Sequence, residues 1–99
     1  MRKKREREAG TELEEVFSSK LRMKILVLIY NLGSLNTSDV ARRLKTNFAT
    51  VAEHLKILED EGILQGRLYG RVRMYRFNES SAKAKAVQNL IETWQQNKQ

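Results

Sequence analysis

The stretch that decides the fold runs from Asn36 to Phe77 and reads NTSDVARRLKTNFATVAEHLKILEDEGILQGRLYGRVRMYRF. Asn36 is a typical helix N-cap, because its side-chain oxygen can accept from a free backbone N–H in the first turn. Three apolar residues then share one face at helical spacing, namely Val40, Ala41 and Leu44. The spacing predicts a short amphipathic helix that starts directly after Asn36.

A second helix is predicted after a three-residue turn, Lys45-Thr46-Asn47. Asn47 can cap it, and Gly62 can end it by accepting a left-handed backbone conformation. Its inward face consists of apolar residues at four-three spacing, which are Val51, Leu55 and Leu58. Two short helices around so tight a turn predict a helix-turn-helix, with residues 47–61 as its second helix.

A hairpin is predicted next. The candidate strands Ile63–Leu68 and Arg71–Phe77 are joined by Tyr69-Gly70, a two-residue turn compatible with a hairpin. There is no acidic residue between Leu64 and Phe77, but there are four arginines, namely Arg67, Arg71, Arg73 and Arg76. This order predicts a winged helix-turn-helix, mainly α-helical with a small β-hairpin as its wing.

Helices are predicted on both sides of this segment. Thr11 and Glu14 fit a capping box for a short first helix, and Ser19 can cap a second helix that Gly33 ends. Asn78 or Ser80 can start a last helix that runs to about residue 95. The terminal helices offer more apolar surface than one small domain can cover, and this predicts a dimer interface. The residues expected there are Leu13, Val16, Phe17, Val87, Leu90, Ile91 and Trp94. The alternative is a monomer whose last helix folds back on its own domain.

Length and composition restrict the domain organisation and the partner. Ninety-nine residues suffice for one domain, expected at residues 11–99, after a disordered basic arm at residues 1–10. A formal net charge of +7 favours a polyanionic partner. The longest apolar run, Ile25–Tyr30, is too short to cross a membrane, and no secretory signal is seen. We therefore expect a soluble protein without a membrane partner, located in the cytoplasm and associated with the nucleoid.

Four segments resemble the ArsR family of winged helix-turn-helix regulators and, more distantly, MarR-type regulators. FSSKLRMKIL (17–26) is similar to the start of the family's second helix, and DVARRL (39–44) to the first helix of its reading pair. TVAEHLKILEDEGIL (50–64) resembles its recognition helix, and GRVRMYRFN (70–78) its second wing strand. The resemblance implies a dimer that binds DNA.

Metal sensing and catalysis are not expected. Metal-sensing members of that family carry cysteines in the helix that aligns with residues 38–44, or acidic and histidine pairs in the last helix. This chain has no cysteine, and its last helix has Glu92 but no histidine. The single histidine, His54, has no nucleophile at a suggestive spacing, so we expect it to pack or to hydrogen-bond to the backbone near the core. The sequence predicts no enzyme, metal or cofactor.

DNA contacts can be assigned from the expected geometry. The start of the second reading helix should face the major groove, where the outward residues are Asn47, Phe48, Thr50 and Glu53. Phosphate contacts are expected from Ser38, Arg42, Arg43, Lys45 and Lys56. The wing should bring Arg67, Arg71 and Arg73 to the minor groove and backbone. Alternation puts Arg71 and Arg73 on the strand face of Tyr75 and Phe77, so the strand must twist or bend to free Arg73 if these aromatic residues pack inward. Arg71, beside the turn glycine, is therefore the first choice for insertion.

These features predict a sequence-specific regulator of transcription that binds double-stranded DNA. We expect a homodimeric repressor with residues 47–61 in the major groove and residues 64–77 on the minor groove or backbone. Two alternatives remain open. The first is an architectural DNA-binding protein with little sequence preference, which the apolar and alanine-rich reading surface favours. The second is a winged helix that binds another protein through Phe48 and its neighbours.

Overall fold

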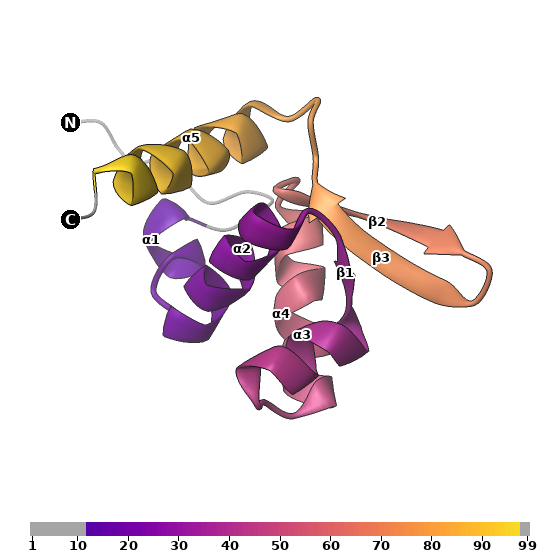
Figure 1. Ribbon diagram of the computed structural model, residues 1–99. Helices are drawn as coiled ribbons and strands as arrows, with labels where there is room; N and C mark the ends of the chain where they lie inside the picture. The colour runs from indigo at the N-terminus through magenta and orange to yellow at the C-terminus, as the bar shows by residue number, and fades with distance from the viewer. Residues whose placement is uncertain (1–11, 98–99) are drawn as a thin grey trace.

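The computed structural model of the chain describes residues 12–97, which form five helices and one three-stranded sheet (Figure 1). In chain order the elements are α1 (Leu13–Val16), α2 (Lys20–Leu32), β1 (Leu35–Asn36), α3 (Thr37–Leu44), α4 (Phe48–Asp60), β2 (Leu64–Tyr69), β3 (Val72–Phe77) and α5 (Ala82–Gln96). Figure 1 shows α3 and the start of α4 at one end of the molecule, with α1 and α5 at the other. The β2–β3 hairpin projects to the side. The mainly helical fold with a wing is therefore confirmed.

Side-chain caps set the starts of the longer helices. The caps predicted at Ser19, Asn36 and Asn47 are confirmed, since each side chain accepts from the backbone N–H three residues later. The last helix starts later than expected, because Ser81 caps it and Asn78 instead accepts from the Ser80 N–H. In α1 the N-cap is Glu12, which makes no side-chain capping bond. Thr11 of the expected capping box and the expected basic arm lie outside the described residues.

The sheet contains one strand that the sequence did not predict. Its order is β1-β3-β2, and both pairings are antiparallel. The two residues of β1, Leu35 and Asn36, pair with Tyr75 and Met74 of β3. A strand of two residues has no periodicity of its own, so only its pairing partner reveals it. Through β1 the wing is joined directly to the residue that caps α3.

The hairpin turn differs by one residue from the prediction. Tyr69 pairs with Val72, so the turn residues are Gly70-Arg71 rather than Tyr69-Gly70. Gly70 has φ +66°, and Arg71 is not among the residues with positive φ. A positive φ at the first turn residue alone is typical of a type II′ turn, which favours glycine there. This register places Arg71 at the tip of the wing.

The core lies where α2 meets the reading helices and the base of the wing. From α2 it takes Ile25, Leu26 and Ile29, all fully buried. The reading helices contribute Val40, Ala41, Val51, Leu55 and Leu58, and the sheet contributes Leu35, Leu64, Tyr75 and Phe77. The Tyr30 ring meets the Phe77 ring edge to face, with 6.5 Å between centroids. The reading pair and the base of the wing therefore share one apolar core.

The terminal helices use part of their predicted interface inside the chain. Val16, Val87 and Ile91 are buried in the core of the chain itself, because α5 lies against α2 through one face. These three side chains, expected at the dimer interface, therefore pack within the chain, and their place at such an interface stays a prediction. Leu13, Leu90 and Trp94 remain exposed, and Phe17 is half-buried.

Candidate nucleic-acid interface

The turn between α3 and α4 fixes the direction of the reading helix. The Thr46 N–H donates to the Ala41 carbonyl (2.9 Å) and the Lys45 N–H to the Arg42 carbonyl (3.3 Å). These two bonds form a Schellman motif, whose left-handed position is held here by Lys45 at φ +53°. Asn47 then accepts from the Thr50 N–H (3.1 Å) and starts α4. The chain therefore turns sharply while its backbone groups stay hydrogen-bonded.

The start of α4 presents an exposed surface. Val51 and Leu55 are fully buried, so the opposite side of the helix faces solvent. Phe48 is 56% exposed, so its ring is open to a partner. Of the other residues expected to meet base edges, Asn47 and Glu53 are exposed and Thr50 is half-buried. Three of the four side chains expected to face the major groove are therefore exposed to solvent, and their contact with bases stays a prediction.

Cations surround this surface. All five residues expected to contact phosphates are exposed, namely Ser38, Arg42, Arg43, Lys45 and Lys56. Two of the cations already have partners, since Arg42 pairs with Asp39 at 3.0 Å and Lys56 with Asp60 at 3.4 Å. Within residues 12–97, Arg43 and Lys45 form no ion pair. They can therefore meet a phosphate without first giving up a carboxylate.

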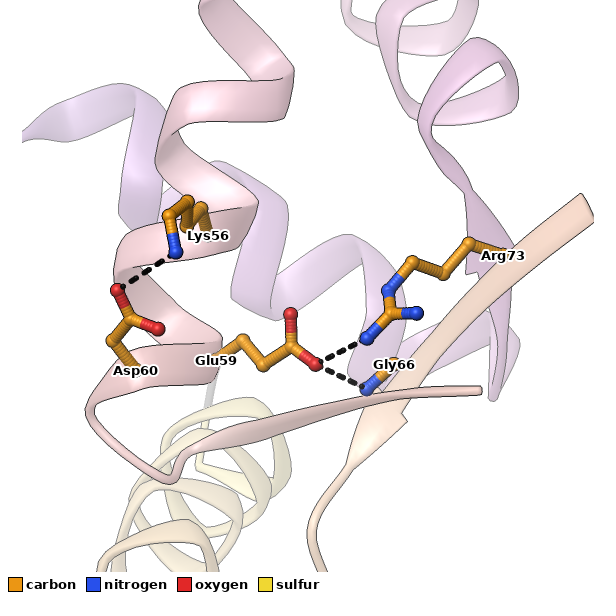
Figure 2. Close-up of polar contacts among 5 residues, drawn as sticks. All are labelled: Lys56, Glu59, Asp60, Gly66 and Arg73. Atoms are coloured by element: carbon orange, nitrogen blue, oxygen red, sulfur yellow. Dashed lines mark hydrogen bonds and ion pairs between the residues drawn. The ribbon is translucent and has the colours of Figure 1, made fainter. Parts of the chain in front are cut away.

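The three arginines expected to act from the wing have different surroundings. Arg67 and Arg71 are exposed and form no ion pair with any described residue. Arg73 donates from Nη2 to Oε2 of Glu59 on α4 at 2.8 Å (Figure 2). This hydrogen bond, together with the charge of Glu59, raises the pKa of Arg73. Arg67 and Arg71 are thus the wing arginines whose charge no described carboxylate balances.

Gly66 lies beside this ion pair, and its N–H also donates to Glu59 Oε2 (3.3 Å). A Cβ at this position would lie 2.6 Å from Arg73 Nε and 3.0 Å from both Glu59 Oε2 and Tyr75 Cε1. No side chain fits there unless these neighbours move, so the strand requires glycine for the close approach of α4.

His54 links α4 to the start of α2. Its Nδ1 accepts from Arg22 Nε (3.1 Å), and Nη1 of the same arginine donates to the carbonyls of Glu15 and Val16. Burial, followed by the positive charge of Arg22, lowers the pKa of His54, and Glu53 opposes this shift. The expected structural role is therefore found, although the partner is a side chain on another helix and not the backbone.

Several contacts were absent from the sequence prediction. Glu59 and Arg22 each join elements that are far apart in the chain, so no local spacing predicts them. Glu61 is also buried and pairs with Lys83 of α5 at 2.9 Å. One signal was present, because a glycine inside a strand, as at Gly66, often marks close approach of another backbone or side chain.

The part of the chain that the structure describes contains neither a candidate metal site nor a candidate membrane span. No three histidine, aspartate or glutamate side chains lie together in a way that could hold a metal ion. No helix in this part is long and apolar enough to span a bilayer.

The helix pair with its Schellman turn, followed by a basic hairpin that packs beside the second helix, defines a winged helix-turn-helix protein. The family model described as "MarR family" matches residues 19–66, which include α2, α3, α4 and the start of β2.

Solved structures from several bacteria are similar over most of the chain. Reduced HlyU from Vibrio cholerae is 20% identical and has a TM-score of 0.72, with 88% of this chain and 86% of that chain covered. The transcriptional repressor PagR of Bacillus anthracis is 23% identical with a TM-score of 0.66, covering 78% and 85%. A homodimeric winged helix-turn-helix DNA-binding domain from Mycobacterium bovis, described as a possible ArsR-family regulator, is 19% identical with a TM-score of 0.68, covering 85% and 75%. These likenesses show a shared fold.

One curated relative is similar at the level of sequence. It is the uncharacterised HTH-type transcriptional regulator B-115 of Sulfolobus spindle-shape virus 1, which is 45% identical over 58 residues. The match covers 54% of this chain and 50% of that protein, so the chain spans about half the length of this relative.

Proposed function

We propose that this chain is a homodimeric regulator of transcription that reads double-stranded DNA and represses by occupying promoter sites. The observation that carries the proposal is the exposed start of α4, which lies beside Arg43 and Lys45. The wing nearby carries Arg67 and Arg71, and none of these four cations forms an ion pair with a described residue. PagR, described as a transcriptional repressor, and B-115, described as a transcriptional regulator, support this function by their likeness to the chain.

In the proposed complex the first turns of α4 enter the major groove. Asn47 has amide donors left after capping, Phe48 can contact a thymine methyl, and Glu53 can accept from a cytosine amino group. Arg43 and Lys45 then hold the flanking phosphates, which fixes the position of the protein on the duplex without reading sequence. Arg67 and Arg71 extend to the minor groove, where narrow A·T-rich tracts attract guanidinium groups.

The second copy of the chain is proposed to dock on α5. Leu90, which is 50% exposed, stands between two apolar hollows of about 300 and 450 Å³. The first is lined mainly by α1 and α5 and includes Leu13 and Phe17. The second lies between α2 and α5 beside Trp94. A ridge flanked by hollows can interlock with its own copy around a two-fold axis, and the Mycobacterium bovis domain is described as homodimeric.

One observation favours a second function, that of an architectural DNA-binding protein. The reading surface contains Ala49 and Ala52 next to Phe48, so few side chains on it can hydrogen-bond to base edges. Such a protein would depend on phosphate contacts and bind most duplexes alike.

The test is selection from a pool of random duplexes, followed by measurement of affinity for what is retained. The wild type is compared with Arg71→Ala and with Arg76→Ala, a matched control that removes the same charge from the same hairpin but from a residue paired with Glu79. We expect a two-fold-symmetric motif with half-sites about 10 base pairs apart, or a multiple of this distance. Arg71→Ala should weaken binding about tenfold, and Arg76→Ala much less.

Three other outcomes of this selection would contradict the proposed function or the proposed dimer. Strong retention that depends on Arg71 but enriches no motif would replace the proposal with the architectural function. No retention at moderate salt would exclude both and leave a winged helix that binds another protein. An enriched motif without two-fold symmetry would contradict the proposed dimer.

A further inference from the structure

A single carboxylate oxygen of the reading helix accepts hydrogen bonds from both strands of the wing. Oε2 of Glu59, in the last turn of α4, accepts from the Gly66 N–H of β2 and from Arg73 Nη2 of β3. Figure 2 shows Glu59 between α4 and the hairpin, with both donors directed at it. One side chain of the reading helix therefore holds both strands of the wing.

The surroundings of this contact leave it little freedom. The space over Gly66 is closed by Arg73, Glu59 and Tyr75, as the distances from a Cβ there indicate. The Arg73 guanidinium carbon lies 5.9 Å from the centroid of the Tyr75 ring, and Tyr75 is buried in the core. Arg73 is thus held from one side by Glu59 and from the other by a ring that cannot move far.

The contact also marks the end of the fixed part of the wing. At its base, Leu64 and Phe77 are buried and paired with each other. Beyond Gly66, every residue from Arg67 to Arg73 is exposed. Glu59 therefore holds the wing at the point where its exposed part, which contains Arg67 and Arg71, begins, and β1 pairs with β3 at the same level.

Simple geometry shows why this direction matters. Glu59 lies eleven residues after Phe48, which corresponds to about 16 Å along the helix. The wing extends from Gly66 to Gly70, about 13 Å at the usual rise of a strand, so a change of about 10° at the base moves the tip by about 2 Å. Hydrogen bonds are lost over such a distance. The angle between α4 and the wing therefore decides whether the start of α4 can occupy the major groove while Arg71 reaches the adjacent minor groove.

We propose that Glu59 is a positioning residue, which holds the wing at the angle to α4 that lets Arg71 reach DNA while the start of α4 occupies the major groove. The inference rests on the proposed function, since it concerns the geometry of the same DNA site. Glu59 itself does not contact DNA. Its contribution to the stability of the fold is small, because an ion pair whose arginine side chain is 43% exposed is largely screened by water.

The neighbouring carboxylate of Asp60 provides a matched control. Asp60 lies on the same helix and pairs with Lys56, away from the wing (Figure 2). Glu59→Ala and Asp60→Ala remove the same charge, and this change alone favours binding to a polyanion. A loss of affinity in Glu59→Ala that is absent from Asp60→Ala therefore reports the position of the wing and not the net charge.

The experiment measures affinity for a duplex selected by the wild type, in the wild type, Glu59→Ala, Asp60→Ala, Arg71→Ala and the Glu59→Ala/Arg71→Ala double variant. We expect Glu59→Ala to bind about tenfold more weakly and Asp60→Ala to bind at least as tightly as the wild type. The double variant should bind like Arg71→Ala, because the placement of the wing by Glu59 is proposed to act through Arg71. Glu59→Gln, which keeps an acceptor for the Gly66 N–H, should lie between, and it serves as the second variant if Glu59→Ala does not fold.

The outcomes separate the inference from the proposed function. A wild type that retains no duplex overturns both. Retention by the wild type with equal affinities for Glu59→Ala and Asp60→Ala overturns the inference alone. Independent losses in the double variant also overturn it, since they would mean that Glu59 acts through something other than Arg71. Thermal unfolding of each variant is measured alongside its affinity for DNA. If Glu59→Ala loses affinity because it is partly unfolded, the result counts against a positioning role.

Discussion

The reading pair and the wing are held in place by different kinds of interaction. The helices α3 and α4 are capped by their own residues, Asn36 and Asn47, and fixed in the core by fully buried side chains such as Val51 and Leu55. The wing shares that core only at its base, and its middle is fixed to α4 by the polar contacts of Glu59. The position of the reading helix therefore depends mainly on buried side chains and caps, whereas the middle of the wing also depends on an ion pair at the surface.

This difference divides the interface into a rigid part and an adjustable part. The inward side chains of α4 are fully buried in a closely packed core, so a shift of this helix would cost free energy. An exposed ion pair is weaker and responds to salt. If the wing contributes to sequence selection, it is the part through which small changes can alter DNA preference while the fold remains intact.

The largest effect is expected from the core of the reading helix. Leu55→Ala removes a fully buried side chain and should lower the free energy of unfolding by about 2 to 5 kcal/mol, since the cavity adds to the lost burial. Urea unfolding followed by circular dichroism measures this. Lys56→Ala, one residue further along the helix and exposed, is the control, and it should change stability by less than about 0.5 kcal/mol.

The comparison would fail if these two substitutions had similar effects on unfolding. Such a result would mean that the packing around α4 relaxes easily, and the reading helix could then not serve as the rigid reference for the wing.

A smaller effect is expected inside the wing. Gly66→Ala places a methyl group against Arg73, Glu59 and Tyr75 and should cost about 1 to 3 kcal/mol through overpacking. Hydrogen exchange should then be faster at the amides of β2 and β3 than in the wild type, with α4 little changed. Gln65→Ala, the preceding residue on the same strand, is the control. Equal exchange rates at these amides in all three proteins would show that β2 accommodates the methyl group without loss of stability. Such a result would contradict a wing that is held fixed at Gly66.

The sequence predicted the reading pair more accurately than the wing. The caps at Asn36 and Asn47 and the apolar spacing of Val51, Leu55 and Leu58 are local signals, so the reading pair was placed within a residue of its true bounds. The wing depends on pairing between distant segments. Its turn was placed one residue early, because two adjacent positions can each carry a plausible turn, and only the Tyr69–Val72 pair decides between them.

The contacts that orient the site were the least predictable from sequence. Glu59 is 14 residues from Arg73, and Arg22 is 32 residues from His54, so neither pair follows from a helical or strand period. The assignment of Arg73 to DNA could not foresee that a helix carboxylate already binds it. Strand alternation did place Arg73 on the face of Tyr75 and Phe77, and both of these side chains are buried.

The smallest effect is expected from pH, through the contact that joins α4 to α2. His54 accepts from Arg22 through Nδ1, so the bond requires neutral imidazole. Because burial and Arg22 lower the pKa of His54 below its usual 6.5, the unfolded chain takes up the proton before the folded one does as pH falls. This contribution to stability is complete above about pH 6.5 and is lost as the pH falls through the lower, folded-state pKa.

Urea unfolding of the wild type and of His54→Gln, from about pH 8 to about pH 5, measures this contribution. The glutamine side chain does not titrate and offers an amide oxygen to Arg22 at every pH. The carboxylates are the same in both proteins, so their titrations cancel when the two free energies of unfolding are subtracted. The wild type should lose stability relative to His54→Gln on acidification. Parallel curves would show that His54 is free to protonate in the folded chain, and that the reading helix is held to the body by its apolar face alone.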